Sequence, residues 1–170
     1  MAKINSKTTI EELAARVSEA LQAAGIQAVL SGGAAVSIYT RNEYESGDLD
    51  FISGENMDSI ERVMSELGFE RRGRTFVHPQ AVYFVEFPPG PLAIGEQLIR
   101  ENEIATRETS SGTIRLLSPT QCVMDRLAAY FHWKDLQSLD QAVLVAKNQK
   151  VSLKTIEAWA KLEGSLDKFE

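Results

Sequence analysis

The sequence predicts a mixed α/β domain followed by a helical part. Up to residue 117, short apolar runs typical of strands alternate with segments of helical periodicity, and from Ser118 onward every apolar pattern has helical spacing. We therefore expect residues 1–117 to form an α/β domain and residues 118–170 a C-terminal helical subdomain. The 170 residues suit one compact domain with a small helical lobe.

The first expected helix is marked by a capping-box pattern at residues 8–11, Thr-Thr-Ile-Glu. Apolar residues then follow helical spacing until Gly25, namely Ile10, Leu13, Val17 and Leu21. A short apolar run at 27–30 predicts a buried strand. Gly32 and Gly33 follow at once, and residues 34–39 are expected to form one or two helical turns.

Residues 48–52 alternate acidic and apolar side chains, which predicts a second strand. Asn56 is expected to cap a helix that runs through Leu67 and ends at a glycine. Residues 69–87 predict two more strands, joined near His78, because β-forming residues are enriched there.

The remaining elements are a hairpin and three helices. The prolines at 88–91 end the preceding strand and begin a loop, and residues 104–117 predict a hairpin turning at 110–112. Ser118, with proline next and Gln121 three residues later, is a strong helix start. Three helices are then expected, at about 119–132, 135–147 and 152–162.

Composition narrows the class of protein. The 18 basic and 24 acidic residues give a net charge of −6, which argues against a domain held on nucleic acid by bulk electrostatics but leaves local contact with RNA open. The single cysteine, Cys122, excludes an intrachain disulfide and is compatible with a reducing compartment. No signal-peptide pattern and no run of ~20 apolar residues occurs, so we expect a cytoplasmic protein that does not span a membrane.

The glycine pair is the first candidate for binding a ligand. Gly32 and Gly33, between a strand and a helix, allow backbone N–H groups to approach a phosphate closely. Taken alone, the pair favours a tight strand-to-helix turn over a phosphate-binding loop. The glycine motifs of dinucleotide-binding and P-loop proteins are absent from the sequence.

The acidic strand is the second candidate. Asp48 and Asp50 are two residues apart, so on a strand they project from one face while Leu49 and Phe51 pack behind. Two carboxylates this close repel each other, and a divalent cation such as Mg²⁺ between them explains the pairing. The alternative is a solvated strand end.

Together these features resemble the nucleotidyltransferase superfamily with the DNA polymerase β-like fold. The resemblance rests on residues 32–35 (Gly-Gly-Ala-Ala), Arg41 and residues 46–51 (Ser-Gly-Asp-Leu-Asp-Phe). This string is also similar to the AbiEii-type branch, which includes toxin nucleotidyltransferases of toxin–antitoxin systems. Residues 125–129 and 134–136 stand where that branch has Asp-Lys-Leu-x-Ala and Lys-Asp-Leu, with arginine in place of the first lysine.

The resemblance implies a minimal mixed sheet flanked by helices, with a helical part after it. It also implies that Asp48 and Asp50 hold Mg²⁺ or Mn²⁺ together with a third carboxylate on a later strand. Glu86, which ends an apolar strand, is the candidate for that carboxylate and for helping to deprotonate the acceptor; a salt bridge at the rim is the alternative. The implied nucleotide-binding residues are Ser31, Gly32, Gly33, Arg41, Ser46 and Lys134.

The implied reaction transfers a nucleoside monophosphate from an NTP to a hydroxyl of an RNA end, a protein or a small molecule such as an aminoglycoside, with an antitoxin as a possible partner. Two departures from the family pattern motivate an alternative. Ser31 replaces a lysine that often precedes the glycine pair, and glutamate stands at position 86 where aspartate is common. The alternative is a non-catalytic nucleotide-binding or protein-interaction module with the same fold.

Three aromatic residues near the end of the first C-terminal helix, Tyr130, Phe131 and Trp133, are expected to form core between helices rather than a base-stacking platform. His132 is expected to cap carbonyl groups at the end of that helix.

Overall fold

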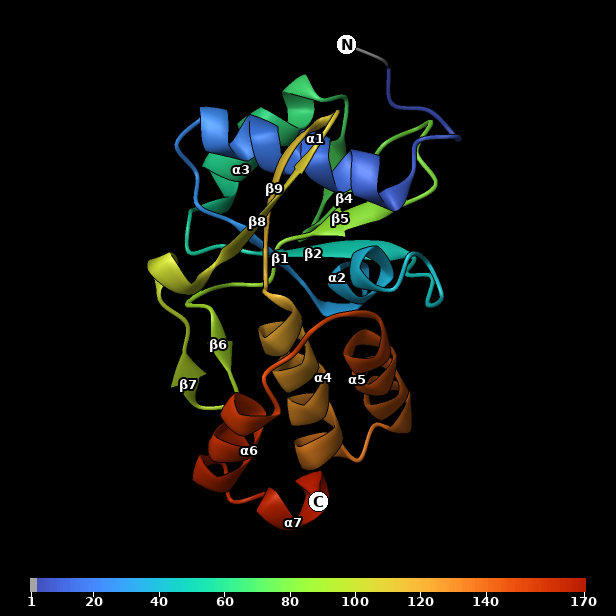
Figure 1. Cartoon of the computed structure of the whole chain (residues 1–170). Helices are drawn as coiled ribbons and strands as arrows, with labels where there is room; N and C mark the ends of the chain where they lie inside the picture. The colour runs from blue at the N-terminus through green and yellow to red at the C-terminus, as the bar shows by residue number, and fades with distance from the viewer. Residues whose placement is uncertain (1–2) are drawn as a thin grey trace.

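The computed structural model describes residues 3–170. Its centre is a seven-stranded mixed sheet in the order β3-β4-β5-β2-β1-β9-β8 (Figure 1). The strands are β1 (Val29–Ser31), β2 (Asp48–Ile52), β3 (Glu70–Arg72), β4 (Thr75–Val77), β5 (Phe84–Glu86), β8 (Ala105–Thr109) and β9 (Gly112–Leu116). The mixed sheet with flanking helices confirms the predicted fold class.

The register of the central strands determines where polar side chains meet. β2 runs antiparallel to β1, with Asp50 opposite Ser31, and parallel to β5, with Asp50 also opposite Glu86. Facing residues on neighbouring strands lie about 5 Å apart. Asp50 therefore lies at the middle of a row that crosses three adjacent strands.

Three helices pack around this sheet, namely α1 (Ile10–Ala23), α2 (Gly32–Tyr39) and α3 (Met57–Glu66). α1 and α3 lie together on one side, whereas α2 packs against β2 and the C-terminal helices (Figure 1). The α1 capping box is formed by Thr9 and Glu12, one residue later than expected, because the Thr8 hydroxyl already accepts a hydrogen bond from the Asn5 N–H at 2.9 Å.

The C-terminal part contains α4 (Pro119–Trp133), α5 (Leu136–Asn148), α6 (Leu153–Leu162) and the short α7 (Leu166–Phe169). The predicted capping box of Ser118 and Gln121 starts α4. One cluster of buried residues extends from the sheet into these helices and includes Phe51, Phe131 and Trp159. The boundary at Ser118 remains our proposal for the division of the chain.

A small second sheet joins the two parts. β6 (Ala93–Ile94) and β7 (Gln97–Leu98) form a hairpin beside α4 and α6 (Figure 1), in a region where the sequence predicts only a loop. The Trp159 Nε1–H donates to the Ile94 carbonyl at 3.2 Å, and the Glu96 N–H donates to Glu163 Oε1 at 3.0 Å. The short 3₁₀-helix η1 (Glu101–Glu103) follows the hairpin.

Two expectations were wrong. Residues 69–87 form three strands, because Gly73, at φ +69°, turns the chain between β3 and β4. Trp133 is 80% exposed, because α4 ends there and Lys134 adopts the left-handed conformation. The neighbouring Phe131 is core as expected, stacked 5.6 Å from Trp159.

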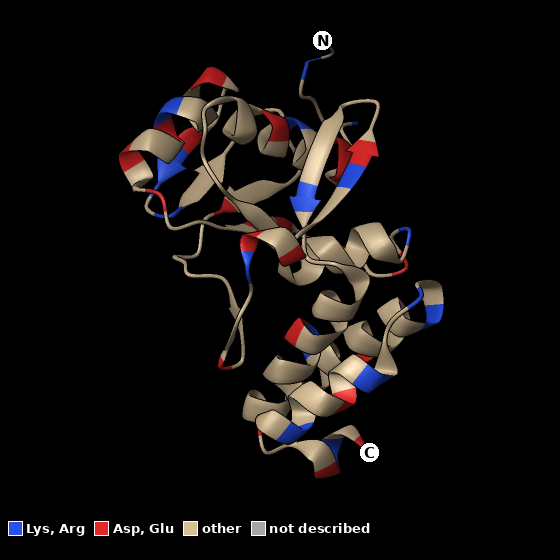
Figure 2. Cartoon of the chain, turned by 60° about the vertical axis from the view of Figure 1, so that its left-hand side comes forward, with Lys and Arg blue, Asp and Glu red and all other residues tan. Residues whose placement is uncertain are grey.

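Charged residues of both signs are interspersed over the α/β part and the helices (Figure 2). Within residues 3–170, none of the helices is both long and apolar enough to cross a bilayer. His132 Nε2 lies 3.9 Å from Glu163 Oε1, at the packing surface of α4 and α6.

Candidate metal and nucleotide site

Three carboxylates converge at the centre of the sheet. Asp48 and Asp50 project from one face of β2, because the strand alternates half-buried and fully buried residues. Glu86 on the parallel strand β5 faces Asp50 in the register. One carboxylate oxygen from each of the three residues lies within 4.8 Å of the other two. The structure thus brings together the three acids that the sequence predicts as metal ligands.

The environment of Asp50 disfavours its negative charge. Burial, which is the largest cause, and the charges of Asp48 and Glu86 together raise its pKa to about 7. Asp50 Oδ1 is buried and has no hydrogen-bond partner within residues 3–170. A buried carboxylate oxygen without a partner is costly. A divalent cation would supply the missing partner and relieve the repulsion, and three hard oxygen donors suit Mg²⁺ or Mn²⁺.

Glu86 is held from the opposite side by strand β4. Thr75 pairs with Glu86 across the antiparallel β4–β5 ladder, and its hydroxyl donates to Glu86 Oε1 at 3.3 Å. Glu86 is half-buried, so solvent or a bound ion can still reach its carboxylate. This arrangement leaves Glu86 able both to bind a cation and to accept a proton.

The glycine pair starts α2 directly beside Asp50. Gly32 has φ +62°, and a Cβ added there would lie 3.1 Å from Asp50 Oδ2. A Cβ added at Gly33 would lie 3.1 Å from Ser46 Oγ. Gly32 therefore serves a left-handed turn, and both glycines allow a close approach. The start of α2 therefore lies next to the acids, with the free N–H groups of its first turn and its partial positive charge.

Two serines of the predicted nucleotide site bind the backbone of the acidic strand. Ser31 Oγ donates to the Asp50 carbonyl at 3.3 Å and makes no side-chain cap to α2. Ser46 Oγ donates to the Asp48 carbonyl at 2.8 Å and lies 3.3 Å from Asp48 Oδ1. Both side chains therefore fix the position of β2, and their hydroxyls are already engaged by it.

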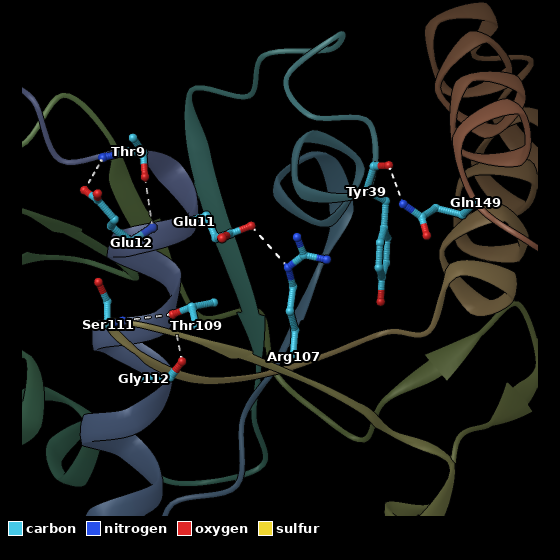
Figure 3. A network of polar contacts seen from close by, with 9 residues as sticks. All are labelled: Thr9, Glu11, Glu12, Tyr39, Arg107, Thr109, Ser111, Gly112 and Gln149. Carbon is cyan, nitrogen blue, oxygen red and sulfur yellow. Dashed lines mark hydrogen bonds and ion pairs between the residues drawn. The ribbon is translucent and has the colours of Figure 1, made fainter.

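The structure does not bring Arg41 to this cluster. Arg41 follows the C-terminal end of α2, and a helix of eight residues is about 12 Å long, so the two ends of α2 lie far apart. Arg41 lines a hollow of about 260 Å³ together with Glu11 and Arg107, which are paired at 3.2 Å (Figure 3). A larger hollow, about 510 Å³, lies between α1 and α3 and contains none of the predicted site residues.

Arg126 is the basic residue that α4 places near the acids, and sequence reasoning did not include it in the site. Its charge partly offsets the raised pKa of Asp50. Its guanidinium is held by Asp125 Oδ2 at 2.7 Å and by Gln141 Oε1 at 3.2 Å. Lys134, by contrast, lies eight residues further along, about 12 Å down the helix axis. One feature of the sequence could have pointed to this residue: Arg126 stands where the resembling motif has a lysine, so the position keeps a positive charge.

No protein-family model and no curated protein sequence matches this chain. Solved structures do resemble it. A crystal structure of ANT(2'')-Ia in complex with adenylyl-2''-tobramycin superposes with a TM-score of 0.58 at 14% identity, covering 88% of this chain and 94% of that one. A solution structure of the antibiotic-resistance factor ANT(2'')-Ia gives 0.57 at 13% identity, covering 94% and 95%.

A third similar structure is the crystal structure of an antigenic nucleotidyltransferase-like protein from Paracoccidioides brasiliensis. It superposes with a TM-score of 0.59 at 14% identity, covering 99% of this chain and 94% of that one. Identities this low concern the fold alone. The chain therefore has the fold of nucleotidyltransferases over nearly its whole length.

Proposed function

We propose that this chain is a Mg²⁺- or Mn²⁺-dependent nucleotidyltransferase that moves a nucleoside monophosphate from an NTP to a hydroxyl acceptor. The observation that carries the proposal is the convergence of three carboxylates within 4.8 Å beside the glycine turn that starts α2. The shared fold of the similar structures supports it.

Asp48, Asp50 and Glu86 would hold the metal. Mg²⁺ bound by these carboxylates supplies positive charge that offsets the charge developing on the α-phosphate and on the leaving pyrophosphate. The Glu86 carboxylate takes the proton of the acceptor hydroxyl. The acceptor oxygen then bonds to the α-phosphorus, and the bond from that phosphorus to the bridging oxygen of the β-phosphate breaks.

The phosphates would be bound by the chain on two sides. The N–H groups of the first turn of α2, which starts beside Asp50, suit an anion. Arg126, fixed by Asp125 and Gln141, supplies a charged donor from α4. Ser31 and Ser46 act by holding β2. We place Arg41 and Lys134 outside the site.

For the acceptor, we propose a small cationic molecule that carries hydroxyl groups. The net charge of −6 attracts cations over polyanions, and one of the similar structures contains an adenylylated aminoglycoside. The same assay can instead identify an RNA end or a protein side chain as the acceptor. Either result would favour a toxin role, with an antitoxin as partner.

The test is release of pyrophosphate from each NTP, with Mg²⁺ or Mn²⁺, in the presence of aminoglycosides, tRNA or protein. We expect turnover with ATP and an aminoglycoside, and its loss in Asp48→Asn and Asp50→Asn. Asp58→Asn, which changes an exposed acid on α3, is the matched control and should retain turnover. Nucleotide binding without pyrophosphate release from any acceptor would instead identify a non-catalytic module.

A further inference from the structure

One face of α2 is built to receive the loop that leads into β2. Gly33, Ser37 and Thr40 lie at positions i, i+4 and i+7, so they share one face of the helix. Ser37 and Thr40 are completely buried. Small and hydroxyl-bearing side chains along this face allow the backbone of residues 44–46 to approach α2 closely.

The chain reaches this face by a sharp reversal. Arg41 and Asn42 both have positive φ, 52° and 63°, and the Asn42 N–H donates to the Ser37 carbonyl at 2.9 Å. Residues other than glycine adopt this conformation only at a cost, which the surrounding contacts must outweigh. The reversal directs residues 44–46 back along α2, toward the glycine turn.

Ser37 is the main connection between the helix and this loop. Its hydroxyl donates to the Tyr44 carbonyl at 2.7 Å and accepts the Ser46 N–H at 3.0 Å. Thr40 Oγ1 is a longer contact, 3.4 Å from the Tyr44 nitrogen. A single buried hydroxyl thus satisfies two backbone groups on either side of Glu45, which fixes the position of Ser46.

Ser46 in turn determines where the acidic strand begins. Its hydroxyl binds the Asp48 carbonyl at 2.8 Å and lies 3.3 Å from both the Asp48 nitrogen and Asp48 Oδ1. Gly33 leaves room for this hydroxyl on the other side, since a Cβ there would lie 3.1 Å from Ser46 Oγ. The path from Ser37 to Asp48 is therefore continuous and consists of hydrogen bonds to backbone.

We propose that Ser37 is a positioning residue for the metal ligand Asp48, acting through Ser46. This inference rests on the metal site of the proposed function. Residues that orient metal ligands from behind typically change metal affinity by 10- to 100-fold when they are removed. Because Ser37 acts at one remove from Asp48, we expect the lower end of this range.

The experiment measures Mn²⁺ binding to the full chain without nucleotide, by the loss of the free Mn²⁺ EPR signal at pH 8. Ser37→Ala should weaken Mn²⁺ binding about tenfold. The matched control is Ser18→Ala, which removes another buried helix hydroxyl that accepts a backbone N–H, from Arg115 at 3.0 Å. It should lower the melting temperature and leave Mn²⁺ affinity within twofold.

A double-mutant cycle tests the route. If Ser37 acts through Ser46, the double variant Ser37→Ala, Ser46→Ala loses no more Mn²⁺ affinity than the weaker-binding single variant. Losses that multiply, or Ser37→Ala binding like the unchanged chain, overturn the inference. Ser37→Cys, close in volume and with weaker hydrogen bonding, serves the same comparison if Ser37→Ala does not fold. If the unchanged chain does not bind Mn²⁺, the proposed metal site itself is refuted.

Discussion

Replacing Asp50 by asparagine should stabilise the metal-free protein while removing metal binding. Asparagine keeps the shape of the side chain but removes a charge that burial and two neighbouring carboxylates, Asp48 and Glu86, disfavour. Its amide can also donate to either neighbour, which turns a repulsion into a hydrogen bond. Metal binding should be lost because a bound cation requires the negative charge of the Asp50 carboxylate.

The size of the effect follows from the pKa of Asp50. Its rise from 3.8 to about 7 corresponds to an upper limit of about 4 kcal/mol, at ~1.4 kcal/mol per pH unit. Because the group is partly exposed, we discount this to about 1–2 kcal/mol. A pKa raised on folding lowers stability as pH rises from about 4 to 7, so the gain from asparagine is absent below that window and complete above it.

The assay is thermal unfolding of both proteins from pH 4 to pH 8, with and without Mg²⁺. At pH 8 without metal, the melting temperature of Asp50→Asn should exceed that of the unchanged chain by about 2–8 °C. Mg²⁺ should raise the melting temperature of the unchanged chain alone. A difference between the proteins that is constant with pH, or equal stabilisation of both by Mg²⁺, would refute the reasoning.

Three further outcomes are expected. Gly32→Ala should lower the free energy of unfolding by about 1–2 kcal/mol in urea, because its φ is +62°, and should weaken Mn²⁺ binding, because its Cβ approaches Asp50 Oδ2. Arg126→Ala should raise the KM for ATP about tenfold, with Arg126→Lys intermediate; an unchanged KM would exclude a phosphate contact. Trp159→Phe should cost about 1–2 kcal/mol in urea, since it leaves the buried Ile94 carbonyl unpaired, and should not change Mn²⁺ affinity.

Locally encoded features of the fold could be predicted from the sequence. The caps at Asn56 and Ser118 lie where the pattern places them, because capping depends on residues within one helical turn. The β6–β7 hairpin was missed because each strand has two residues and its partners, Trp159 and Glu163, lie more than sixty residues away in sequence. A pattern of neighbouring residues in the sequence cannot predict a contact between segments so far apart.

The candidate site divides in the same way. Asp48 and Asp50 could be paired from their spacing alone, because side chains alternate strictly along a strand. Arg41 was expected beside the glycine pair because it belongs to the string that resembles the nucleotidyltransferase family, but α2 carries it to the opposite end of the helix. The position of Arg126 depends on the packing of α4 against α5, where Gln141 holds its guanidinium, and this packing could not be inferred from spacing.

Several locally unfavourable choices meet at one place in this protein. Within residues 3–170, the unpaired buried oxygen of Asp50 and the three acids within 4.8 Å of one another reduce stability, and a neutral replacement of Asp50 would lessen the repulsion. The left-handed turn restricts position 32 to glycine. Around them, Ser31, Ser46 and Thr75 form hydrogen bonds that hold the acids in this arrangement. Costs that are concentrated at one point and supported from two strands and a loop are characteristic of a binding site rather than of ordinary packing. Because a divalent cation is the one ligand that would reverse all of the electrostatic costs at once, metal affinity is the property on which the functional proposal stands.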